Sequence, residues 1–386
     1  MDRPQRCPCP DRINQSNHGG FAPIENRLTP YPYPMLTCTL SAPAKINLYL
    51  EVVGDRPDGF HELVMVMQSV ALADRISLQF QPAATPSPQP SLGITLHCDH
   101  PEVPTDASNL AHRAAALLWE QWSHYGGDRP APQGQLVITI TKNIPVGAGL
   151  AGGSTNAAAV LVGLNHLWEM GLPVAEIERL CAQLGSDIPF CVQGGTVLAL
   201  GRGEVLEPMV NFGKAAGAMP GIPQDPARVA LPGTLPLVLA KYRSLSVSTP
   251  WAYGSYRKQF AAGYVQDAAG VLAHQEAVRS GPMAAAIAAG DTAQICQNLH
   301  NDLERVVLPQ YSAVSRLRAA FATQVGVVGT MMSGSGPTVF AICESLEAAA
   351  TVRQRVADRL QDADLDFWVT HSLPHGVHLQ TAESVG

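Results

Sequence analysis

The sequence contains no apolar stretch long enough to cross a membrane. Its N-terminal part lacks the basic segment and apolar run of a signal peptide, and it has too few serines for a transit peptide. Because these signals are missing, we expect a cytoplasmic protein that does not associate with membranes.

Positive charge is also scarce, since 25 Lys and Arg residues stand against 32 Asp and Glu residues, for a net charge of −7. A negatively charged molecule is a poor general partner for nucleic acid. An anionic substrate would have to be bound by a few local Lys or Arg side chains or by backbone N–H groups. The composition therefore argues against nucleic acid and leaves small anions open.

Closely spaced cysteines are nearly absent. Of eight cysteines only Cys7 and Cys9 are neighbours, in a Pro-rich segment, which is a weak metal signal. Cys181, Cys191 and Cys343 lie in apolar runs and should be buried as small hydrophobic side chains. This usage fits a reducing cytoplasm. The sequence leaves open whether the protein is a monomer or a homodimer.

The length of 386 residues is enough for two domains. Residues 1–34 are rich in Pro, Asn and Gly without periodicity, which predicts a disordered tail. Residues 35–206 mix strand-like and helix-like runs, and residues 237–386 do the same. The Gly- and Pro-rich residues 207–236 should be a linker or an insertion. We thus predict an α+β protein of two domains.

Periodicity predicts the individual elements. Polar and apolar residues alternate in residues 44–53, so one strand face should carry Lys45, Asn47, Tyr49 and Glu51. A helix at 174–184 should be closed by Gly185 as its C′ residue. The same reasoning predicts helices at 109–122, 249–262, 283–305 and 311–324, and strands at 76–80, 94–98, 237–241, 327–333 and 339–343.

A glycine-rich segment is the most informative feature present. It consists of Pro145, Val146, Gly147, Ala148, Gly149, Leu150, Ala151, Gly152, Gly153, Ser154, Thr155 and Asn156. A β-like run precedes it, and a helix with one apolar face, at 157, 160, 161, 164, 167 and 168, should follow. Glycines let the backbone approach a phosphate closely, and the first turn of a helix favours negative charge. The segment is therefore predicted to bind phosphate rather than to form only a structural turn.

The segment matches neither of two well-known nucleotide loops. A Walker A loop needs a Lys after its last glycine, and none follows Gly152 or Gly153. Gly147, Gly149 and Gly152 have the spacing of a dinucleotide-binding loop, but a long segment precedes them and no acidic residue follows a second strand at the expected distance.

Lys45 and Asp187 are the candidates for chemistry beside this loop. Alone, Lys45 is compatible with a solvated charge at a strand edge, and Asp187 with the N-cap of a helix. Beside a phosphate loop, the pair suits phosphoryl transfer, in which a protein positions reactants and stabilises charge. Asp187 would accept the proton of a substrate hydroxyl or only orient that hydroxyl. Lys45 would keep the carboxylate ionised and offset charge on the γ-phosphate.

Two turns carry further candidates. At 54–62, Phe60 and His61 either belong to a plain hairpin turn or stack on and hydrogen-bond to a planar base. The Ser333-Gly334-Ser335-Gly336 turn is compatible both with a hairpin turn and with an anion-binding nest.

Three segments, in this order, resemble the GHMP kinase superfamily: Pro43-Ala44-Lys45-Ile46-Asn47-Leu48, the segment from Pro145 to Ala159, and Ser333-Gly334-Ser335-Gly336-Pro337. Two more, from Arg56 to Glu62 and from Leu184 to Phe190, are similar to the branch that acts on 4-diphosphocytidyl-2-C-methyl-D-erythritol. The resemblance leaves the tail and residues 208–236 outside.

The resemblance implies an N-terminal domain like the second domain of ribosomal protein S5 and a ferredoxin-like C-terminal domain. It implies ATP-dependent phosphorylation of the 2-hydroxyl of the erythritol moiety, with Mg²⁺, in the methylerythritol phosphate route to isoprenoids. The catalytic pair would be Lys45 and Asp187. The ATP loop would run from Pro145 to Thr155, with Ser154 near phosphate or Mg²⁺.

Further positions carry over by resemblance, since Asn109 and Lys142 match nucleotide contacts. Asn47, on the same strand face as Lys45, is predicted to bind the substrate. Phe60 and His61 match the cytidine end, where Tyr253 would stack on the cytosine.

The sequence also departs from the family pattern. Ala151 replaces a usual Gly of the loop, and Phe60 replaces a more common Tyr. The chain shows no clear acidic metal ligand, so ATP and Ser154 would hold Mg²⁺. Residues 300–304, which recur in relatives, are expected to cap a helix.

Two alternatives stay open. One is another small-molecule kinase of the superfamily, of the mevalonate or homoserine type, which the turn from Asp58 to His61 disfavours. The other is a non-catalytic nucleotide-binding protein on the same scaffold, which the presence of both Lys45 and Asp187 disfavours.

Overall fold

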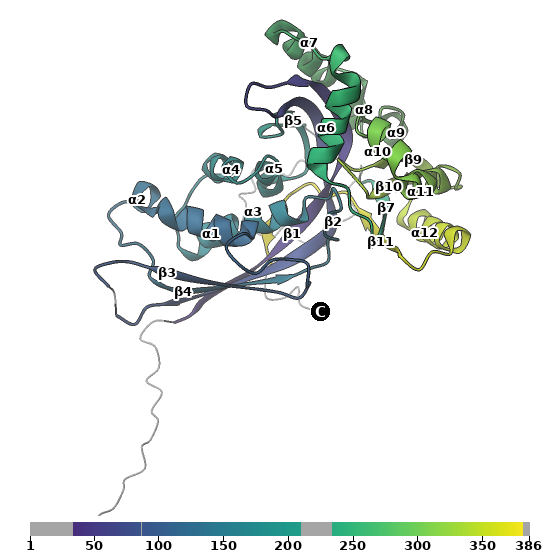
Figure 1. The fold of residues 1–386 in the computed structure, drawn as a ribbon. Coiled ribbons are helices and arrows are strands. Elements are labelled where there is room, and N and C mark those ends of the chain that lie inside the picture. Colours follow the sequence, from purple (N-terminus) through teal and green to yellow (C-terminus); the bar gives the residue numbers. More distant parts are fainter. Residues whose placement is uncertain (1–33, 86, 210–233, 381–386) are drawn as a thin grey trace, which may run out of the picture. The chain divides into compact units, whose positions relative to one another are not determined.

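The protein is described from a computed structural model, in which residues 34–85, 87–209 and 234–380 are described. The predicted tail and the predicted linker lie outside these residues except at their ends. Figure 1 shows the elements in chain order. Among the described helices, none has the length and apolar character to cross a bilayer.

A long antiparallel hairpin forms the centre of the first sheet. It joins β1 (Leu36–Asp55) to β2 (His61–Pro82), with Leu36 opposite Phe80 and Asp55 opposite His61. The outer edge of β2 serves two partners, β4 (Gly134–Thr141) and β5 (Thr196–Gly201). The two strands of the hairpin, β1 and β2, therefore extend from one end of the sheet to the other.

Shorter strands complete this sheet. β3 (Leu92–Cys98) lies parallel beside β4, and β6 (Val205–Pro208) pairs with β5. Two strands from late in the chain, β8 (His300–Asn301) and β12 (His378–Leu379), pair with β1. Segments far downstream therefore return to the first strand.

Register shifts in β1 decide which side chains share a face. They fall between Pro43 and Ala44, between Asn47 and Tyr49, and between Val52 and Gly54. Such bulges turn the following residues to the other face of the sheet. The prediction that Lys45, Asn47, Tyr49 and Glu51 share a face is therefore wrong beyond Asn47, because Leu50 takes the face of Lys45 and Asn47 and lines the same cleft.

Five helices cover one face of the first sheet (Figure 1). They are α1 (Leu110–Glu120), α2 (Trp122–Tyr125), α3 (Gly152–Leu167), α4 (Val174–Ala182) and α5 (Ile188–Gln193). Helix α3 is buried nearly all round from Thr155 to Leu164. The prediction of a single apolar face is thus too narrow, because α3 packs against both the sheet and other helices.

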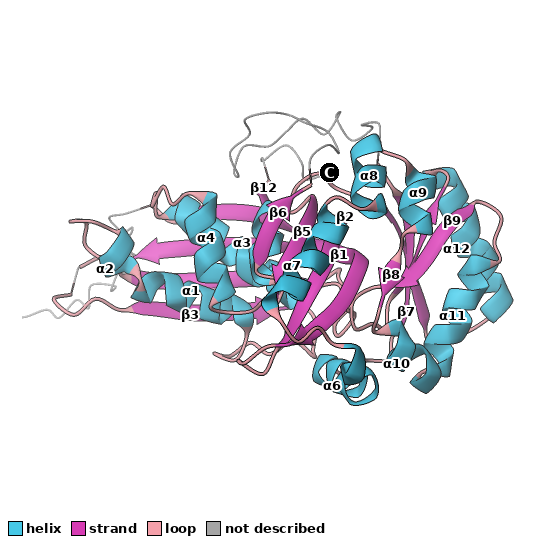
Figure 2. Cartoon of the chain, turned by 90° about the horizontal axis from the view of Figure 1, so that it is seen from above, coloured by secondary structure: helices cyan, strands magenta, loops and turns pink. Residues whose placement is uncertain are grey.

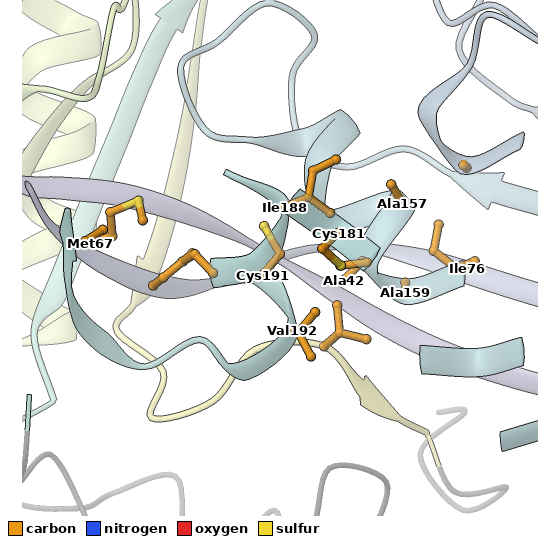
Figure 3. Close-up of a cluster of buried hydrophobic side chains, with 14 of the residues drawn as sticks. Ala42, Met67, Ile76, Ala157, Ala159, Cys181, Ile188, Cys191 and Val192 are labelled. Carbon is orange, nitrogen blue, oxygen red and sulfur yellow. The ribbon is translucent and has the colours of Figure 1, made fainter. Parts of the chain in front are cut away.

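Small side chains allow this close packing. Figure 3 shows Ala157 and Ala159 of α3 near Ala42 of β1 and Ile76 of β2. Cys181 and Cys191 are buried in the same cluster, and Cys343 is buried too, as predicted. Gly185 does not adopt a positive φ, and α4 ends at Ala182, so the predicted C′ glycine is wrong.

The second sheet has the strand order β11-β7-β10-β9, with all neighbours antiparallel. Its strands are β7 (Pro236–Tyr242), β9 (Val327–Met332), β10 (Val339–Cys343) and β11 (Leu365–His371). Helices α11 (Ser312–Ala322) and α12 (Leu346–Leu360) pack on it (Figure 2). This order is the one that a ferredoxin-like domain requires, so the predicted α+β fold is confirmed.

The two faces of the second sheet have different partners. Alternate residues such as Val238 and Ala341 belong to the apolar cluster that includes α11 and α12. The intervening residues, such as Leu239 and Ile342, share a second cluster with Ile46 of β1. The period-2 pattern of β7 and β10 thus attaches this sheet to the first one.

The remaining helices lie between β7 and α11 in the chain. They are α6 (Thr249–Phe260), a 3₁₀ turn (Ala261–Gly263), α7 (Ala268–Arg279), α8 (Pro282–Ala289), α9 (Thr292–Gln297) and α10 (Glu304–Gln310). The predicted helix at 283–305 is wrong as one element. Gly290, with a φ of 65°, ends α8, and the Asp291 side chain caps α9 by accepting from the N–H of Gln294.

Candidate active site

A cleft of about 830 Å³ collects most of the predicted site residues. Its walls come from β1, the glycine-rich segment before α3, the start of α5, and α6. The predicted residues that line it are Lys45, Asn47, Phe60, His61, Asn109, Lys142, Pro145, Val146, Gly147, Ala148, Gly149, Leu150, Ala151, Gly152, Gly153, Ser154, Asp187 and Tyr253. Of the predicted residues, Thr155 alone is not part of this lining in the described chain, because it is fully buried behind it.

Lys45 and Asp187 face each other across the cleft floor. The Lys45 Nζ atom lies 3.7 Å from Asp187 Oδ2 and donates a hydrogen bond of 2.6 Å to Asn47 Oδ1. The Lys45 side chain is 6% exposed and that of Asp187 is 36% exposed. The cation is therefore held inside the wall, while the carboxylate remains open to a ligand.

Asp187 has the backbone position of a helix cap without the usual capping bond. It is the N-cap residue of α5, a helix that lies wholly in the described chain, and its side chain makes no capping hydrogen bond there. Pro189 lacks an N–H, which removes one of the groups that the carboxylate would otherwise satisfy. The capping interpretation is thus wrong for the side chain, which pairs with Lys45 instead.

The glycine-rich segment approaches Lys45 through the backbone. The Lys45 N–H donates a hydrogen bond of 3.1 Å to the Leu150 carbonyl. Ala151, with φ 59° and ψ 30°, is the N-cap of α3 in the left-handed region. The free N–H groups of the first turn of α3, at Gly152, Gly153 and Ser154, therefore begin at the cleft wall.

Lys142 is anchored behind this segment by Asp74, which the sequence analysis did not identify. The Lys142 Nζ atom lies 2.5 Å from Asp74 Oδ2, and both side chains are buried. Asp74 also accepts hydrogen bonds from the N–H groups of Asn143 and Ile144 and from Asn156 Nδ2. The available signal was an acidic residue directly after the apolar residues 70–73 of β2.

Asn109 serves the local structure as well as the cleft. Its Oδ1 accepts the N–H of Ala111 at 2.8 Å as the N-cap of α1, and its Nδ2 donates to the Pro104 carbonyl at 2.6 Å. Pro104 also lines the cleft. Asn109 therefore fixes the position of the loop before α1.

The other end of the cleft is aromatic and basic. The rings of His61 and Tyr253 lie 5.1 Å apart, and the guanidinium of Arg202 lies 4.9 Å from the centre of the Phe60 ring. His61 Nε2 is buried without a hydrogen-bond partner among the described residues. Burial and the charge of Arg257 lower the pKa of His61. Burial, then the charge of Asp187, raises the pKa of Tyr253.

Sequence reasoning missed two cations at this end, Arg202 and Arg257. Arg257 lies one helical turn after Tyr253 on α6 and donates to Asp55 Oδ1 at 2.7 Å. Arg202 lies between Gly201 and Gly203, which both have positive φ, and that pair of glycines was a usable signal. No local pattern marks Arg257, because its place in the cleft depends on how α6 packs.

Metal-binding groups are few. Within residues 34–85, 87–209 and 234–380, no group of three or more His, Cys, Asp and Glu side chains could hold a metal ion. The Ser154 hydroxyl, one of the oxygen donors that line the cleft, is a group of the kind that Mg²⁺ binds. Mg²⁺ prefers oxygen ligands and commonly binds through substrate phosphates with one or two protein groups.

Comparison with known proteins identifies the family. The GHMP kinase N-terminal domain matches residues 109–195, and the GHMP kinase C-terminal domain matches residues 283–362. A 4-diphosphocytidyl-2-C-methyl-D-erythritol kinase from Nostoc punctiforme is 50% identical over 348 residues, covering 90% of this chain and all of the relative. The relative from Acaryochloris marina is 50% identical over 341 residues, covering 88% of this chain and 98% of its own.

A solved structure agrees with this result. The crystal structure of a 4-(cytidine 5′-diphospho)-2C-methyl-D-erythritol kinase, 27% identical, covers 86% of this chain and 98% of its own with a TM-score of 0.57. The fold, the length of the match and the level of identity all point to one family. The chain belongs to the 4-diphosphocytidyl-2-C-methyl-D-erythritol kinase family of the GHMP kinases.

Proposed function

We propose that this enzyme transfers the γ-phosphoryl group of ATP to the 2-hydroxyl of 4-diphosphocytidyl-2-C-methyl-D-erythritol, as a step of isoprenoid precursor biosynthesis. The observation that carries the proposal at the level of residues is the Lys45–Asp187 pair, 3.7 Å apart beside the glycine-rich segment. The family membership supports the same substrate.

In the proposed reaction the 2-hydroxyl oxygen forms a bond to the γ-phosphorus while the bond from that phosphorus to the β,γ-bridging oxygen breaks. ADP leaves with the electron pair of the broken bond. The proton of the hydroxyl passes to the Asp187 carboxylate, whether Asp187 removes it early as a base or mainly orients the hydroxyl. The open position of Asp187 in the cleft supports this role.

Lys45 would stabilise the charge on the transferred group. Its ammonium is held by Asn47 at 2.6 Å, so it is already oriented before substrate binds. The N–H groups at the start of α3 and the Lys142 ammonium would bind the phosphates of ATP. Mg²⁺, held by the ATP phosphates and Ser154, would supply further neutralisation of the phosphate charge.

The aromatic end would bind the cytidine. The Nε2 of His61 makes no hydrogen bond among the described residues and lies 3.7 Å from Asp55 Oδ1, and it would supply a hydrogen-bonding group for the base. Phe60 and Tyr253 would supply ring faces. Arg202 and Arg257 supply positive charge on the same side, where a diphosphate must lie.

We also propose a cytoplasmic location and either a monomer or a homodimer. The cysteines of the described residues are all free, which supports a reducing compartment. Gel filtration combined with light scattering tests the oligomeric state.

One assay tests the function. ADP release is measured with 4-diphosphocytidyl-2-C-methyl-D-erythritol, mevalonate and homoserine in parallel. We expect release with the first substrate only. Release only with mevalonate or homoserine would assign another kinase specificity, and release with none would indicate a non-catalytic nucleotide-binding protein.

A further inference from the structure

Residues 300–304 are a motif singled out in the sequence that the proposed reaction does not use. The prediction that they cap a helix is wrong in its main part, because the N-cap residue of α10 is Leu303, whose side chain has no polar atom. His300 and Asn301 instead form β8, parallel to β1. None of the five residues is among those that line the cleft in the described chain.

Asn301 uses its amide fully. Its Nδ2 donates to the carbonyls of Met332 and Gly334, both at 2.8 Å, and its Oδ1 accepts the N–H of Leu303 at 3.0 Å. The side chain is buried. One NH₂ group has two hydrogens, so the two carbonyls take its entire donor capacity. Asn301 therefore ties both ends of the bend from Met332 to Gly334.

The bend held by Asn301 touches the reacting groups. Gly334 has a φ of 57°, and a Cβ atom there would lie 3.2 Å from Asn47 Oδ1 and 3.4 Å from Lys45 Nζ. The Ser333 hydroxyl donates to the Gly149 carbonyl at 3.2 Å. A small shift of this turn would therefore displace Lys45, Asn47 or the glycine-rich segment.

The neighbours of Asn301 hold the same parts. Asp302 Oδ2 accepts the N–H of Val52 at 2.9 Å, which fixes β1 beyond the bulge. Glu304 Oε1 accepts the N–H of Met332 at 2.8 Å, at the end of β9. The segment thus connects the strand that carries Lys45 with the turn that faces it.

We propose that Asn301 is a positioning residue for phosphoryl transfer, which holds the Ser333–Gly336 turn against Lys45 and the glycine-rich segment. This inference rests on the proposed function. The turn lies against Lys45, Asn47 and the glycine-rich segment, and Ser335 hydrogen-bonds to Thr249 at the start of α6, not to Tyr253 or Arg257. Its displacement should therefore reduce kcat more than it raises KM for either substrate.

The test compares Asn301→Ala and Asn301→Asp with the wild type. We expect kcat to fall about 100-fold in both at neutral pH, with each KM within about threefold. The carboxylate of Asn301→Asp would face two carbonyl oxygens, and its protonated form regains one donor. Its kcat relative to wild type should therefore rise between about pH 8 and about pH 6, while that of Asn301→Ala stays constant.

Two controls separate positioning from stability. Asn298→Ala removes an amide that lies just before this segment, at the end of α9, and donates to the Gln294 carbonyl, so it should leave kcat unchanged. Val314→Ala weakens the buried core of the same domain. Two results would overturn the inference. One is that Val314→Ala, at a free energy of unfolding equal to that of an Asn301 variant, loses as much kcat as that variant. The other is that the Asn301 variants keep kcat within about twofold of the wild type. An inactive wild type would instead contradict the proposed function.

Discussion

Asp187 illustrates how one side chain can occupy a structural position and face a ligand. Its backbone begins α5, but its carboxylate pairs with Lys45 in the cleft and contributes no cap. Without this capping hydrogen bond, the short helix α5 is about 1 kcal/mol less stable. Such local costs are common where a carboxylate is reserved for chemistry.

The first prediction concerns this carboxylate. Asp187→Asn keeps the size of the side chain and removes its charge and its basicity. We expect turnover to fall at least about 100-fold, equivalent to roughly 2.7 kcal/mol of barrier, while ATP affinity measured by calorimetry stays unchanged. Asp358→Asn on α12, whose carboxylate bonds only to Gln354 in its own helix, is the control. If turnover fell by less than about tenfold, the catalytic role proposed for Asp187 would be wrong.

Ala151 carries strain at the start of α3. Its φ of 59° places a Cβ atom in the left-handed region, which costs about 1–2 kcal/mol for a residue with a side chain. We expect Ala151→Gly to raise the free energy of unfolding by about 0.5–1 kcal/mol, because the gain exceeds the added chain entropy of glycine. Urea unfolding measures this difference. Ala148→Gly, in the same segment at an ordinary φ, should lower stability instead.

At the scale of elements, the bulges of β1 decide which of its side chains point into the cleft. Without the shift at Asn47/Tyr49, the alternation would place Lys45 and Leu50 on opposite faces. The Lys142–Asp74 pair fixes the segment after β4 in the same way, through four hydrogen bonds to one carboxylate. The positions of the loops therefore depend on irregularities in strands rather than on the loops alone.

The last described strand should respond to pH. His378 lies on β12, which pairs with β1, and burial, then the charge of His375, lowers its pKa. A histidine with a lowered folded pKa binds its proton more tightly in the unfolded chain. Its contribution to stability is therefore complete above the unfolded pKa of about 6.5 and is lost as the pH falls from there towards the folded pKa.

A matched pair of proteins measures this effect. The free energy of unfolding is compared between wild type and His378→Gln at several pH values. We expect the wild type to lose stability relative to the variant as the pH falls below about 6.5. A difference that did not change with pH would contradict the prediction.

At the scale of the whole described chain, the glycine-rich segment and the Ser333–Gly336 turn of the second sheet meet at Gly149. A Cβ atom there would lie 2.5 Å from the Ser333 carbonyl oxygen and 3.0 Å from that of Gly336. Backbone atoms cannot move aside as a side chain would. The close approach of these two loops is therefore a condition for the cleft geometry.

Two glycine variants test this contact. Gly149→Ala and Gly147→Ala both place a Cβ at positive φ, but at Gly147 the nearest atom is Ser246 Cβ at 3.4 Å. Both should lose about 1 kcal/mol or more through backbone strain. We expect Gly149→Ala to lose additional stability and, unlike Gly147→Ala, to lose most of its turnover. If the two substitutions had equal effects on thermal unfolding and on ADP release, the contact between Gly149 and the Ser333–Gly336 turn would be unimportant.

Much of the site was predictable from local patterns. The strand, the glycine-rich segment and the following helix are recognisable because backbone freedom at glycine and helix periodicity are local properties. Lys45 and Asp187 were identified because the types of residue suit phosphoryl transfer, and the resemblance of the motifs led to the family. Thr155 was included with its neighbours, since a sequence does not reveal which residue of a helical turn faces inward.

What the sequence alone determined is most of the elements that it predicted, the glycine-rich segment before a helix, and the family. Only the tertiary structure decided that Lys45 and Asp187 approach to 3.7 Å, that Tyr49 turns away from Asn47, and that Asn301 holds the turn beside them. The physical reason is that local sterics and hydrogen bonding act between near neighbours in the chain. Contacts between distant segments, in contrast, follow from how whole sheets and helices pack.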